Sequence, residues 1–296
     1  MSAPAISAGP RLPEWVAGAR PRTLFVAVVP VIVGTGVAAA GTGAIWWRSL
    51  LALVVSLAIQ VGTNYANDYS DGLRGTDAVR VGPLRLVASG TASPQAVRRA
   101  ALASFGVAGV AGLVLALVTS PYLILVGALC LAAGWLYTGG PKPYGYLGLG
   151  ELFVFVFFGL VAVVGTAYVS LGRVTALSVV ASVPVGLLAV ALLVVNNLRD
   201  IHNDEASGKR TLAVRLGEAR TRLLYEGCLL AVFAGVAGVV TYRPAGAIAF
   251  AALPVAAAPF EKVRRGAVGR DLIDALALTT RLGLVVGILL AFGIAL

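Results

Sequence analysis

Charged residues are scarce in this chain of 296 residues, of which only 12% are Asp, Glu, Lys or Arg. Soluble domains carry about 25% charged residues, whereas here 59% of the residues are hydrophobic and the mean hydropathy is +0.92. This composition excludes a soluble domain and predicts a polytopic membrane protein. A spanning helix needs about 20 apolar residues, and we expect nine spans, at roughly 22–42, 49–67, 97–118, 122–139, 149–170, 174–197, 222–241, 244–261 and 275–295.

Histidine and cysteine are also scarce, with one His and two Cys in the chain. Cys130 and Cys228 each lie alone within an apolar run. We therefore interpret them as small buried hydrophobic residues rather than as a disulfide or a metal pair. His202 lies between Asp200 and Asp204, and we interpret it as an exposed spacer because its helical face differs from theirs.

The chain lacks the alternation of apolar and polar residues over about ten positions that marks a transmembrane strand. Its apolar runs are continuous, so the predicted fold is all-α, a bundle of nine transmembrane helices with cytoplasmic cap loops. Residues 1–20 form a cytoplasmic or interfacial segment, and residues 21–296 form one transmembrane domain. Within this domain we expect two four-helix halves, about 21–147 and 148–262, and a ninth helix, because two polar clusters recur four helices apart.

Positive charge is nearly absent from one side of the predicted bundle. Of the 23 Lys and Arg residues, Arg48, Arg173 and Arg243 lie opposite the N-terminus, Arg281 lies within the last span, and the other 19 share the N-terminal side. Cytoplasmic loops carry an excess of Lys and Arg. We therefore expect a multi-pass protein of the cell membrane with its N-terminus in the cytoplasm and its C-terminus outside. The net charge of +10 is an orientation signal, and its distribution argues against a nucleic-acid partner.

All 13 Asp and Glu residues lie on the cytoplasmic side or at helix ends that face it. The orientation rule does not require acids there, so this side is the predicted working face. The acids form two clusters, NYANDYSDGLRGTD (Asn64 to Asp77) and NNLRDIHNDEASGKRTLAVRLG (Asn196 to Gly217). Both clusters end an even-numbered apolar run, and Asp68 and Asp200 are 132 residues apart.

The spacing within each cluster indicates a chemical role, because residues three and four apart share one face of a helix. The predicted stripes contain Asn64, Asp68 and Asp71 in the first cluster and Asn196, Asp200 and Asp204 in the second. A carboxylate at mid-membrane costs about 2.5–3.5 kcal/mol, so a partner must offset its charge. Magnesium binds carboxylate oxygen, water and substrate phosphate. Two facing stripes around Mg2+ would hold a diphosphate between them.

Cations lie among these acids. Arg74, Arg80 and Arg85 follow the first cluster, and the second contains Arg199, Lys209, Arg210 and Arg215. Carboxylates for a metal, combined with Arg and Lys for phosphate, are typical of a diphosphate site. A third loop, YTGGPKPYGYLGLGE (Tyr137 to Glu151), adds Lys142 and three tyrosines. It is interpreted either as a tight helix–helix turn with an aromatic belt or as part of the site.

The motifs NDYSDG and DIHND resemble the two Asp-rich motifs of the UbiA-type intramembrane prenyltransferases, which are nine-helix enzymes, and the resemblance covers essentially the whole chain. Three further stretches, GPLRLVASG, KPYGYLGLGE and NNLRDIHNDEASGKRTLAVRLG, are similar to the branch of this family that prenylates 1,4-dihydroxy-2-naphthoate in menaquinone synthesis. Many relatives have an Asp four residues after the second Asp of the first motif. Here that position is Gly75, and Asp77 follows two residues later.

The resemblance implies Mg2+-dependent transfer of a polyprenyl group from an allylic polyprenyl diphosphate to 1,4-dihydroxy-2-naphthoate, with loss of CO2 and diphosphate, to give demethylmenaquinol. It assigns catalytic and metal-binding roles to Asp68, Asp71, Asp200 and Asp204, and a further metal-binding role to Asp77. The residues expected to bind the diphosphate are Asn64, Asn67, Arg74, Arg80, Lys142, Asn196, Arg199, Lys209 and Arg210. Those expected to bind the acceptor are Arg22, Arg85, Tyr137 and Tyr144.

Three alternatives remain open on these residues. A UbiA-type enzyme for another aromatic acceptor, 4-hydroxybenzoate or homogentisate, would carry the same Asp motifs. CDP-alcohol phosphotransferases also have D-x2-D-G on a membrane helix, but their motif continues x2-A-R, whereas Leu73-Arg74-Gly75-Thr76 follows here. A transporter usually has its acids at the bilayer midplane on broken helices, whereas these acids lie at helix ends. The motifs specify neither the donor chain length nor the oligomeric state.

Overall fold

The computed structural model describes residues 10–76 and 84–296, and every regular element in these ranges is helical. The predicted all-α fold is therefore confirmed, while Asp77 and Arg80 lie outside the described residues. The elements are α1 (Leu12–Gly18), η1 (Pro21–Thr23), α2 (Phe25–Ala40), α3 (Trp46–Arg74), α4 (Pro94–Val118), α5 (Tyr122–Leu136), η2 (Tyr144–Leu147), α6 (Gly150–Val154), the π-helix η3 (Phe155–Val161), α7 (Ala162–Leu171), α8 (Ala176–Ala206), α9 (Leu212–Val240), η4 (Pro244–Ala252), α10 (Leu253–Arg264) and α11 (Arg270–Ala295).

Most of the described helices are apolar and long enough to cross a membrane. Seven spans meet this condition, namely α3, α4, α8, α9, α11 and the compound spans α6–η3–α7 and η4–α10. An eighth results if Leu12–Thr23 and Phe25–Ala40, which meet at 54°, are counted as one broken span. Helix α5 is apolar but has only 15 residues. The chain is therefore a multi-pass membrane protein, and the number of nine spans stays a prediction.

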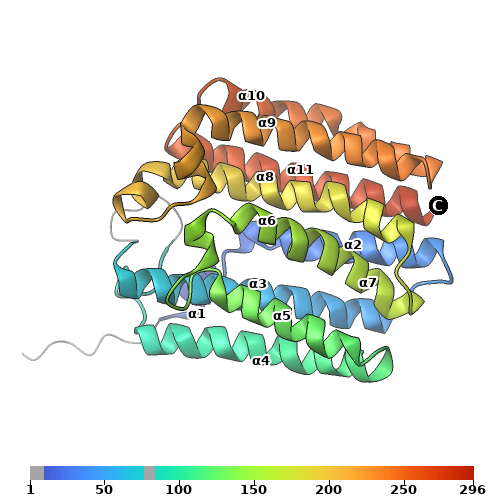
Figure 1. The fold of residues 1–296 in the computed structure, drawn as a ribbon, viewed down its shortest axis with the longest axis horizontal. Coiled ribbons are helices and arrows are strands. Elements are labelled where there is room, and N and C mark those ends of the chain that lie inside the picture. Colours follow the sequence, from blue (N-terminus) through green and yellow to red (C-terminus); the bar gives the residue numbers. More distant parts are fainter. Residues whose placement is uncertain (1–9, 77–83) are drawn as a thin grey trace, which may run out of the picture.

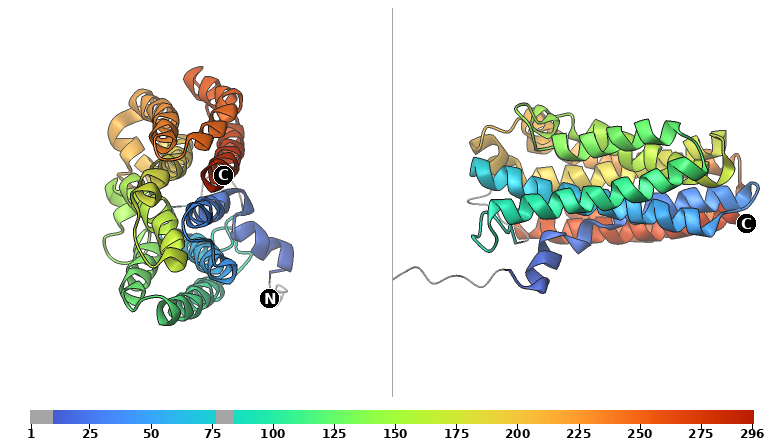
Figure 2. Two further views of the ribbon diagram at one scale, coloured as in Figure 1. Left: turned by 90° about the vertical axis from the view of Figure 1, so that its right-hand side faces the viewer. Right: turned by 90° about the horizontal axis from the view of Figure 1, so that it is seen from below.

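The long helices run side by side, so that their ends gather at the two ends of an elongated bundle (Figure 1). Helices α3, α4 and α5 pack together in one part of the bundle, and α8 to α11 pack together in another. Helix α2 joins the two parts because it contacts α3, α7, α8 and α11. The short helix α1 lies at the edge of the bundle and contacts α3 (Figure 2).

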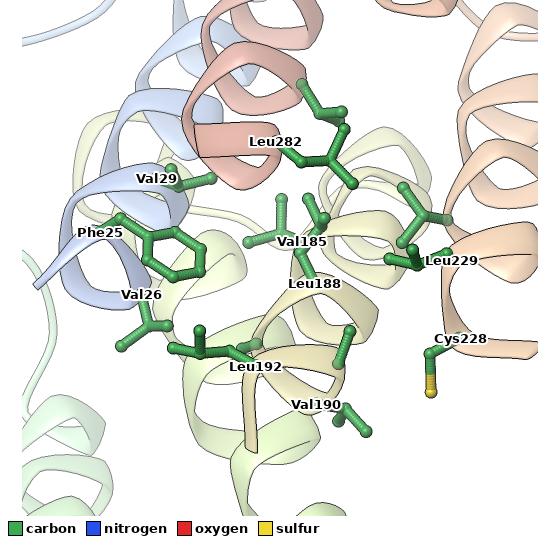
Figure 3. Packing of buried hydrophobic residues seen from close by; sticks show 14 of the residues in the cluster. Phe25, Val26, Val29, Val185, Leu188, Val190, Leu192, Cys228, Leu229 and Leu282 are labelled. Carbon is green, nitrogen blue, oxygen red and sulfur yellow. The ribbon is translucent and has the colours of Figure 1, made fainter. Parts of the chain in front are cut away.

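The main core lies where α2, α8, α9 and α11 meet (Figure 3). Phe25 of α2, Leu188 of α8 and Leu282 of α11 are all at most 5% exposed. Within a membrane such contacts depend on close packing, which small residues permit. Gly36 of α2 is an example, because a Cβ atom there would lie 2.6 Å from the backbone oxygen of Ala291 in α11.

The outer surface of the bundle is apolar, as expected for helices in contact with lipid. Leu102 and Leu117 of α4, Leu129 of α5 and Leu230 of α9 are between 48% and 76% exposed. Such side chains would be unfavourable in water but are matched by the hydrocarbon of a bilayer. The division of the bundle into two four-helix halves stays a prediction.

The helices that carry the acid clusters extend beyond the predicted spans. Helix α3 continues to Arg74 and α8 to Ala206, whereas the apolar runs end near residues 67 and 197. Helix α9 likewise begins at Leu212, before the predicted span, and has a non-helical residue at Gly217. A change in hydropathy marks the edge of the hydrocarbon and not the end of a helix. The described acids of both clusters therefore lie on the last turns of long helices, and the helical twist fixes the directions of their side chains.

Candidate active site

A cavity of about 330 Å³ extends from the acid-bearing end of the bundle into its apolar interior. Its polar end is lined by Asn64, Asn67, Asp71, Asn196, Asn197, Asp200, Asp204 and Lys209. Its apolar end is lined by Leu115, Leu123 and Val169, near the opposite ends of α4, α5 and α7, and these side chains belong to one packed cluster. The cavity thus connects a charged compartment with an apolar one.

Helix α3 contributes Asn67 and Asp71 to this cavity. Asp68, which is 1% exposed, is not among the described lining residues. The Asp68 carboxylate accepts hydrogen bonds from the backbone N–H groups of Leu86 (2.8 Å) and Val87 (3.1 Å). The structure therefore corrects the predicted stripe by one residue, with Asn67 in the place expected for Asp68. Positions three and four apart lie about 60° and 40° apart around a helix, so the spacing did not distinguish the two.

Helix α8 turns both of its predicted acids toward the cavity, because Asp200 and Asp204 are four residues apart. The Arg199 side chain is 3% exposed and is not among the described cavity-lining residues. Its guanidinium donates to both carboxylate oxygens of Asp200, at 2.8 and 2.7 Å. It also donates to the Asn196 side-chain oxygen at 2.9 Å. Arg199 therefore orients a carboxylate and does not itself face the cavity.

The two acid clusters meet at Lys209, which lies in the turn after α8 and is 7% exposed. Its Nζ atom is 3.2 Å from an Asp71 oxygen and 3.9 Å from an Asp204 oxygen. A second link joins the ends of α3 and α8, because the Asn203 side chain donates to the backbone oxygen of Thr76 at 3.1 Å. Clusters that are 132 residues apart in sequence therefore lie together at the polar end of the cavity.

Tyr146, in η2, completes the surroundings of Asp71. Its hydroxyl donates to Asp71 Oδ1 at 2.5 Å, and its ring lies 4.8 Å from Lys209 Nζ. Burial and the negative charge of Asp71 raise the pKa of the Tyr146 phenol well above its usual value of 10.0. The phenol therefore keeps its proton at neutral pH and donates it in the hydrogen bond to the Asp71 carboxylate. Tyr146 is one of the three tyrosines of the predicted third loop, and its position in the sequence indicated no role for it.

The third loop is a turn between helices, and two of its tyrosines face the cavity. Tyr137 and Tyr144, the tyrosines expected to bind the acceptor, line the cavity, and their ring centroids are 5.4 Å apart. Tyr144 stacks on Phe153 at 4.0 Å, and burial raises the pKa of its phenol. Lys142 is exposed and does not line the cavity that the described residues form. The loop is therefore a turn whose residues Tyr137 and Tyr144 form an aromatic wall of the cavity, while Lys142 is exposed.

The predicted arginines separate into two groups. Arg85 is 8% exposed and lines the cavity. Arg22, Arg74 and Arg210 are exposed and are absent from its described lining; Arg74 donates to the backbone oxygens of Thr138 and Gly140 in the third loop.

Arg20, for which the sequence indicated no role, lines the cavity, whereas Arg22 is absent from its described lining. Among the described residues it is the only non-glycine residue with positive φ, at 56°. This left-handed turn precedes η1, and it is a feature that a sequence of ordinary helix-forming residues does not signal.

The scarce residues behave mostly as predicted. His202 is exposed and lies 3.0 Å from Glu218, which supports its interpretation as a spacer. Cys228 is a buried residue of the main core, as predicted, whereas Cys130 is only half-buried and lines the cavity. Neither cysteine forms a disulfide.

The oxygen atoms at the polar end suit a hard cation such as Mg2+. Asp71, Asp200 and Asp204 offer carboxylates, and Asn67 offers an amide oxygen. Among the residues that the structure describes, no three acidic, His or Cys side chains converge on one point, and Lys209 lies between two of the carboxylates. Magnesium is usually bound by one or two carboxylates together with substrate phosphate. The residues therefore fit a metal that binds with a phosphate-bearing substrate better than one held in a protein cage.

The fold and the site together define a helical membrane protein whose charged compartment continues into an apolar cavity. The chain belongs to the UbiA prenyltransferase family, whose sequence model matches residues 27–293. This membership makes the chain a prenyltransferase and removes the CDP-alcohol phosphotransferase and transporter alternatives.

Individual relatives agree with this assignment. The chain is 53% identical over 268 residues to a 1,4-dihydroxy-2-naphthoate octaprenyltransferase from Mycobacterium tuberculosis (strain ATCC 25618 / H37Rv), covering 89% of this chain and 90% of the relative. The fold of this chain resembles that of a UbiA homolog from Aeropyrum pernix K1, with a TM-score of 0.69 and 18% identity. The match covers 89% of this chain and 95% of that chain. A UbiA homolog from Archaeoglobus fulgidus bound to GPP and Mg2+ gives a TM-score of 0.68 at 15% identity, with coverage of 95% and 98%.

Proposed function

We propose that this chain transfers a polyprenyl group from an allylic polyprenyl diphosphate to 1,4-dihydroxy-2-naphthoate, with loss of CO2 and diphosphate, to give demethylmenaquinol. The observation that carries the proposal is the cavity, which joins a compartment with three carboxylates and Lys209 to an apolar end. A polyprenyl diphosphate has the same division into a charged head and an apolar tail. The choice of acceptor is supported by the mycobacterial relative, which is named for this substrate and is 53% identical.

The donor would bind with its diphosphate at the polar end and its tail along the apolar wall. Lys209 is the cation best placed for the phosphate oxygens, because it is buried in the cavity wall beside Asp71. The tail would run between α5 and α7 toward Leu115, Leu123 and Val169. Because these three side chains line the apolar end, we expect them to limit the chain length of the donor.

Asp71, Asp200 and Asp204 would hold magnesium, with Asn67 beside them. When bound, the metal would neutralise the charge that develops on the diphosphate as the allylic C–O bond breaks. Tyr146 keeps Asp71 oriented through its hydroxyl, and Arg199 does the same for Asp200. Lys209 would exchange its carboxylate contacts for phosphate oxygens when the substrate arrives.

The acceptor would bind beside the aromatic wall of Tyr137 and Tyr144. Its carboxylate requires a cation, and Arg20 and Arg85 both line the cavity. Guanidinium groups suit carboxylates because they offer two parallel donors. The apolar surroundings exclude water, which protects the allylic cation until the electron-rich ring attacks it. We propose that this site is on the cytoplasmic side because most Lys and Arg residues lie in the loops and helix ends at the same end of the bundle.

The test is an acceptor panel with one polyprenyl diphosphate and the purified protein in detergent. The panel contains 1,4-dihydroxy-2-naphthoate, 4-hydroxybenzoate, homogentisate and no acceptor, and the assay measures release of pyrophosphate and of CO2. We expect equal amounts of both products with the naphthoate and little of either with the other acceptors. Turnover with 4-hydroxybenzoate, or pyrophosphate without CO2, would contradict the proposed acceptor while leaving the prenyltransferase assignment intact.

A further inference from the structure

The last turns of α3 carry two polar faces, and only one of them faces the cavity. Asn67 and Asp71 line the cavity. Tyr65, Asp68 and Gly72 lie on the neighbouring face and follow the spacing of residues that share one side of a helix. The residues that cover this second face are numbers 84–92, which precede α4 and are called the 84–92 segment below.

Three independent features attach the 84–92 segment to α3. The Asp68 carboxylate accepts the backbone N–H groups of Leu86 and Val87. The Leu86 side chain is fully buried and packs in a hydrophobic cluster with Tyr65. Gly72 leaves room for the segment, because a Cβ atom there would overlap the side chain of Val87.

The segment is also braced internally. The backbone N–H of Ser89 donates to the Arg85 oxygen at 3.0 Å, and that of Ala92 donates to the Leu86 oxygen at 2.9 Å. A short segment with such bonds moves as one unit, so an attachment at Leu86 and Val87 also determines where Arg85 lies. Arg85 is the neighbour of the buried Leu86, and its side chain lines the cavity.

We propose that Asp68 is a positioning residue, which holds the 84–92 segment on α3 and thereby keeps the Arg85 guanidinium in the cavity, and that it is not a metal ligand. The inference rests on the proposed function, because Arg85 needs an anionic substrate group to bind. Asp68 contributes through the backbone of Leu86 and Val87, whereas Asp71 contributes directly to the polar end of the cavity.

The chemistry of the contact explains why a carboxylate stands at this position. Two backbone N–H groups point at the same side chain, and an ionised carboxylate is a pure acceptor with an oxygen for each of them. An asparagine would present one oxygen and one NH2 group, so that one buried N–H would face another donor. A buried donor without an acceptor is costly. Asp68→Asn is therefore expected to detach the segment although the two side chains have almost the same shape.

The experiment compares Asp68→Asn, Arg85→Ala, their double variant and Asp71→Asn in the full-length protein in detergent, with the exposed Asp271→Asn as the matched control. Three quantities are measured: hydrogen exchange of the 84–92 amides, KM for both substrates, and the Mg2+ concentration for half-maximal rate. We expect Asp68→Asn to speed exchange at Leu86 and Val87 and to raise the KM of one substrate by about tenfold or more, as for a lost charge-assisted hydrogen bond.

The other variants give the proposal its specificity. Arg85→Ala should raise the same KM without changing the exchange of the segment, and the double variant should be no worse than the more impaired single variant, because the two residues act in one chain of contacts. Asp68→Asn should leave the Mg2+ requirement unchanged, whereas Asp71→Asn should raise it. If Asp68→Asn does not fold, Gly72→Ala displaces Val87 without touching a carboxylate and should give the same loss of protection and the same change in KM.

Opposite results would overturn the inference. Unchanged exchange in Asp68→Asn would show that the carboxylate does not hold the segment. A raised Mg2+ requirement with unchanged exchange would make Asp68 a metal ligand, and additive effects in the double variant would separate Asp68 from Arg85. Failure of the proposed acceptor is distinguishable, because the exchange measurement needs no substrate and would still report the attachment.

Discussion

The C-terminal ends of α3 and α8 carry nearly the same pattern, Asn-x3-Asp followed by a second Asp, yet the structure uses the two patterns differently. On α8 both acids, Asp200 and Asp204, line the cavity. On α3 only Asp71 does so, while Asp68 binds backbone N–H groups on the neighbouring face. The second interval is three residues in α3 and four in α8. Similar spacing therefore identified the right helices but did not fix the role of each acid.

The ends of α3 and α8 also differ in the basic residues that lie beside their acids. The end of α8 continues directly into the turn with Lys209, whose ammonium contacts the acids from both helices. The end of α3 carries Arg74, which is exposed and donates to backbone oxygens of the third loop, whereas Arg85 lines the cavity from the separate 84–92 segment. One carboxylate of α3, that of Asp68, accepts hydrogen bonds from the backbone of this segment. This comparison can be tested one side chain at a time.

Loss of Asp71 or Asp200 should have the largest effect. Replacing either with Ala removes a proposed metal ligand, and we expect turnover to fall by about 10²- to 10³-fold, the size typical for loss of one group that stabilises developing charge. EDTA should stop the wild-type reaction, and Mg2+ should restore it. The assay is pyrophosphate release, with the exposed Asp274→Ala as the control. Wild-type-like turnover in both variants would refute the proposed metal site.

Lys209→Met should have the next largest effect and should act in two directions. Loss of the ammonium removes a phosphate-binding cation, so we expect the KM of the donor to rise by about tenfold to a hundredfold. The same ammonium competes with a metal for Asp71 and Asp204, so the Mg2+ concentration for half-maximal rate should fall. Lys209→Arg serves as the charge-conserving control. A rise in both quantities would indicate that Lys209 only maintains the shape of the site.

Tyr146→Phe should have a smaller effect, because it removes one hydrogen bond to Asp71 and retains the ring. A bond of this kind contributes about 1 kcal/mol, so we expect about a fivefold rise in the Mg2+ requirement. The raised pKa of the phenol keeps its proton in place at and below pH 10, and the bond is lost only as the pH rises above that value. The wild-type rate should therefore show no loss from ionisation of Tyr146 below pH 10. An alkaline loss near pH 9 that disappears in Tyr146→Phe would contradict this assignment.

Much of this architecture follows from composition and spacing. Continuous apolar runs predict membrane helices because the hydrocarbon leaves no other partner for the backbone, and the four-helix interval places Asp68 and Asp200 at the same end of the bundle. These are properties of whole helices, so errors of a few residues do not change them. The number of spans is less secure, because α5 has only 15 residues and the N-terminal helices meet at 54°.

Features that depend on local geometry could not be predicted from the sequence. Arg20 enters the cavity through a left-handed turn, while the predicted Arg22 stays exposed. Asn67 takes the place expected for Asp68, because around the helix axis both positions lie within about 60° of Asp71 and the spacing alone allows either of them. Lys142 and Arg210 carry the expected charge in the expected loops, but both are exposed and neither is among the described cavity-lining residues. Loop side chains follow turn conformations, which a charge pattern does not determine.

The smallest effect on turnover is expected from variants that report orientation, on which the proposal that both helix ends share a cytoplasmic site depends. In a background without Cys130 and Cys228, single cysteines replace Leu73 at the end of α3 and Glu205 at the end of α8, and both positions are exposed. Arg173→Cys marks the loop at the opposite end of the bundle. An impermeant thiol reagent applied to intact cells should label only the third cysteine. Label on Arg173→Cys and on just one of the others would place α3 and α8 on different sides and contradict the contacts at Lys209. Label on both helix ends, with Arg173→Cys protected, would invert the orientation and leave the shared site intact.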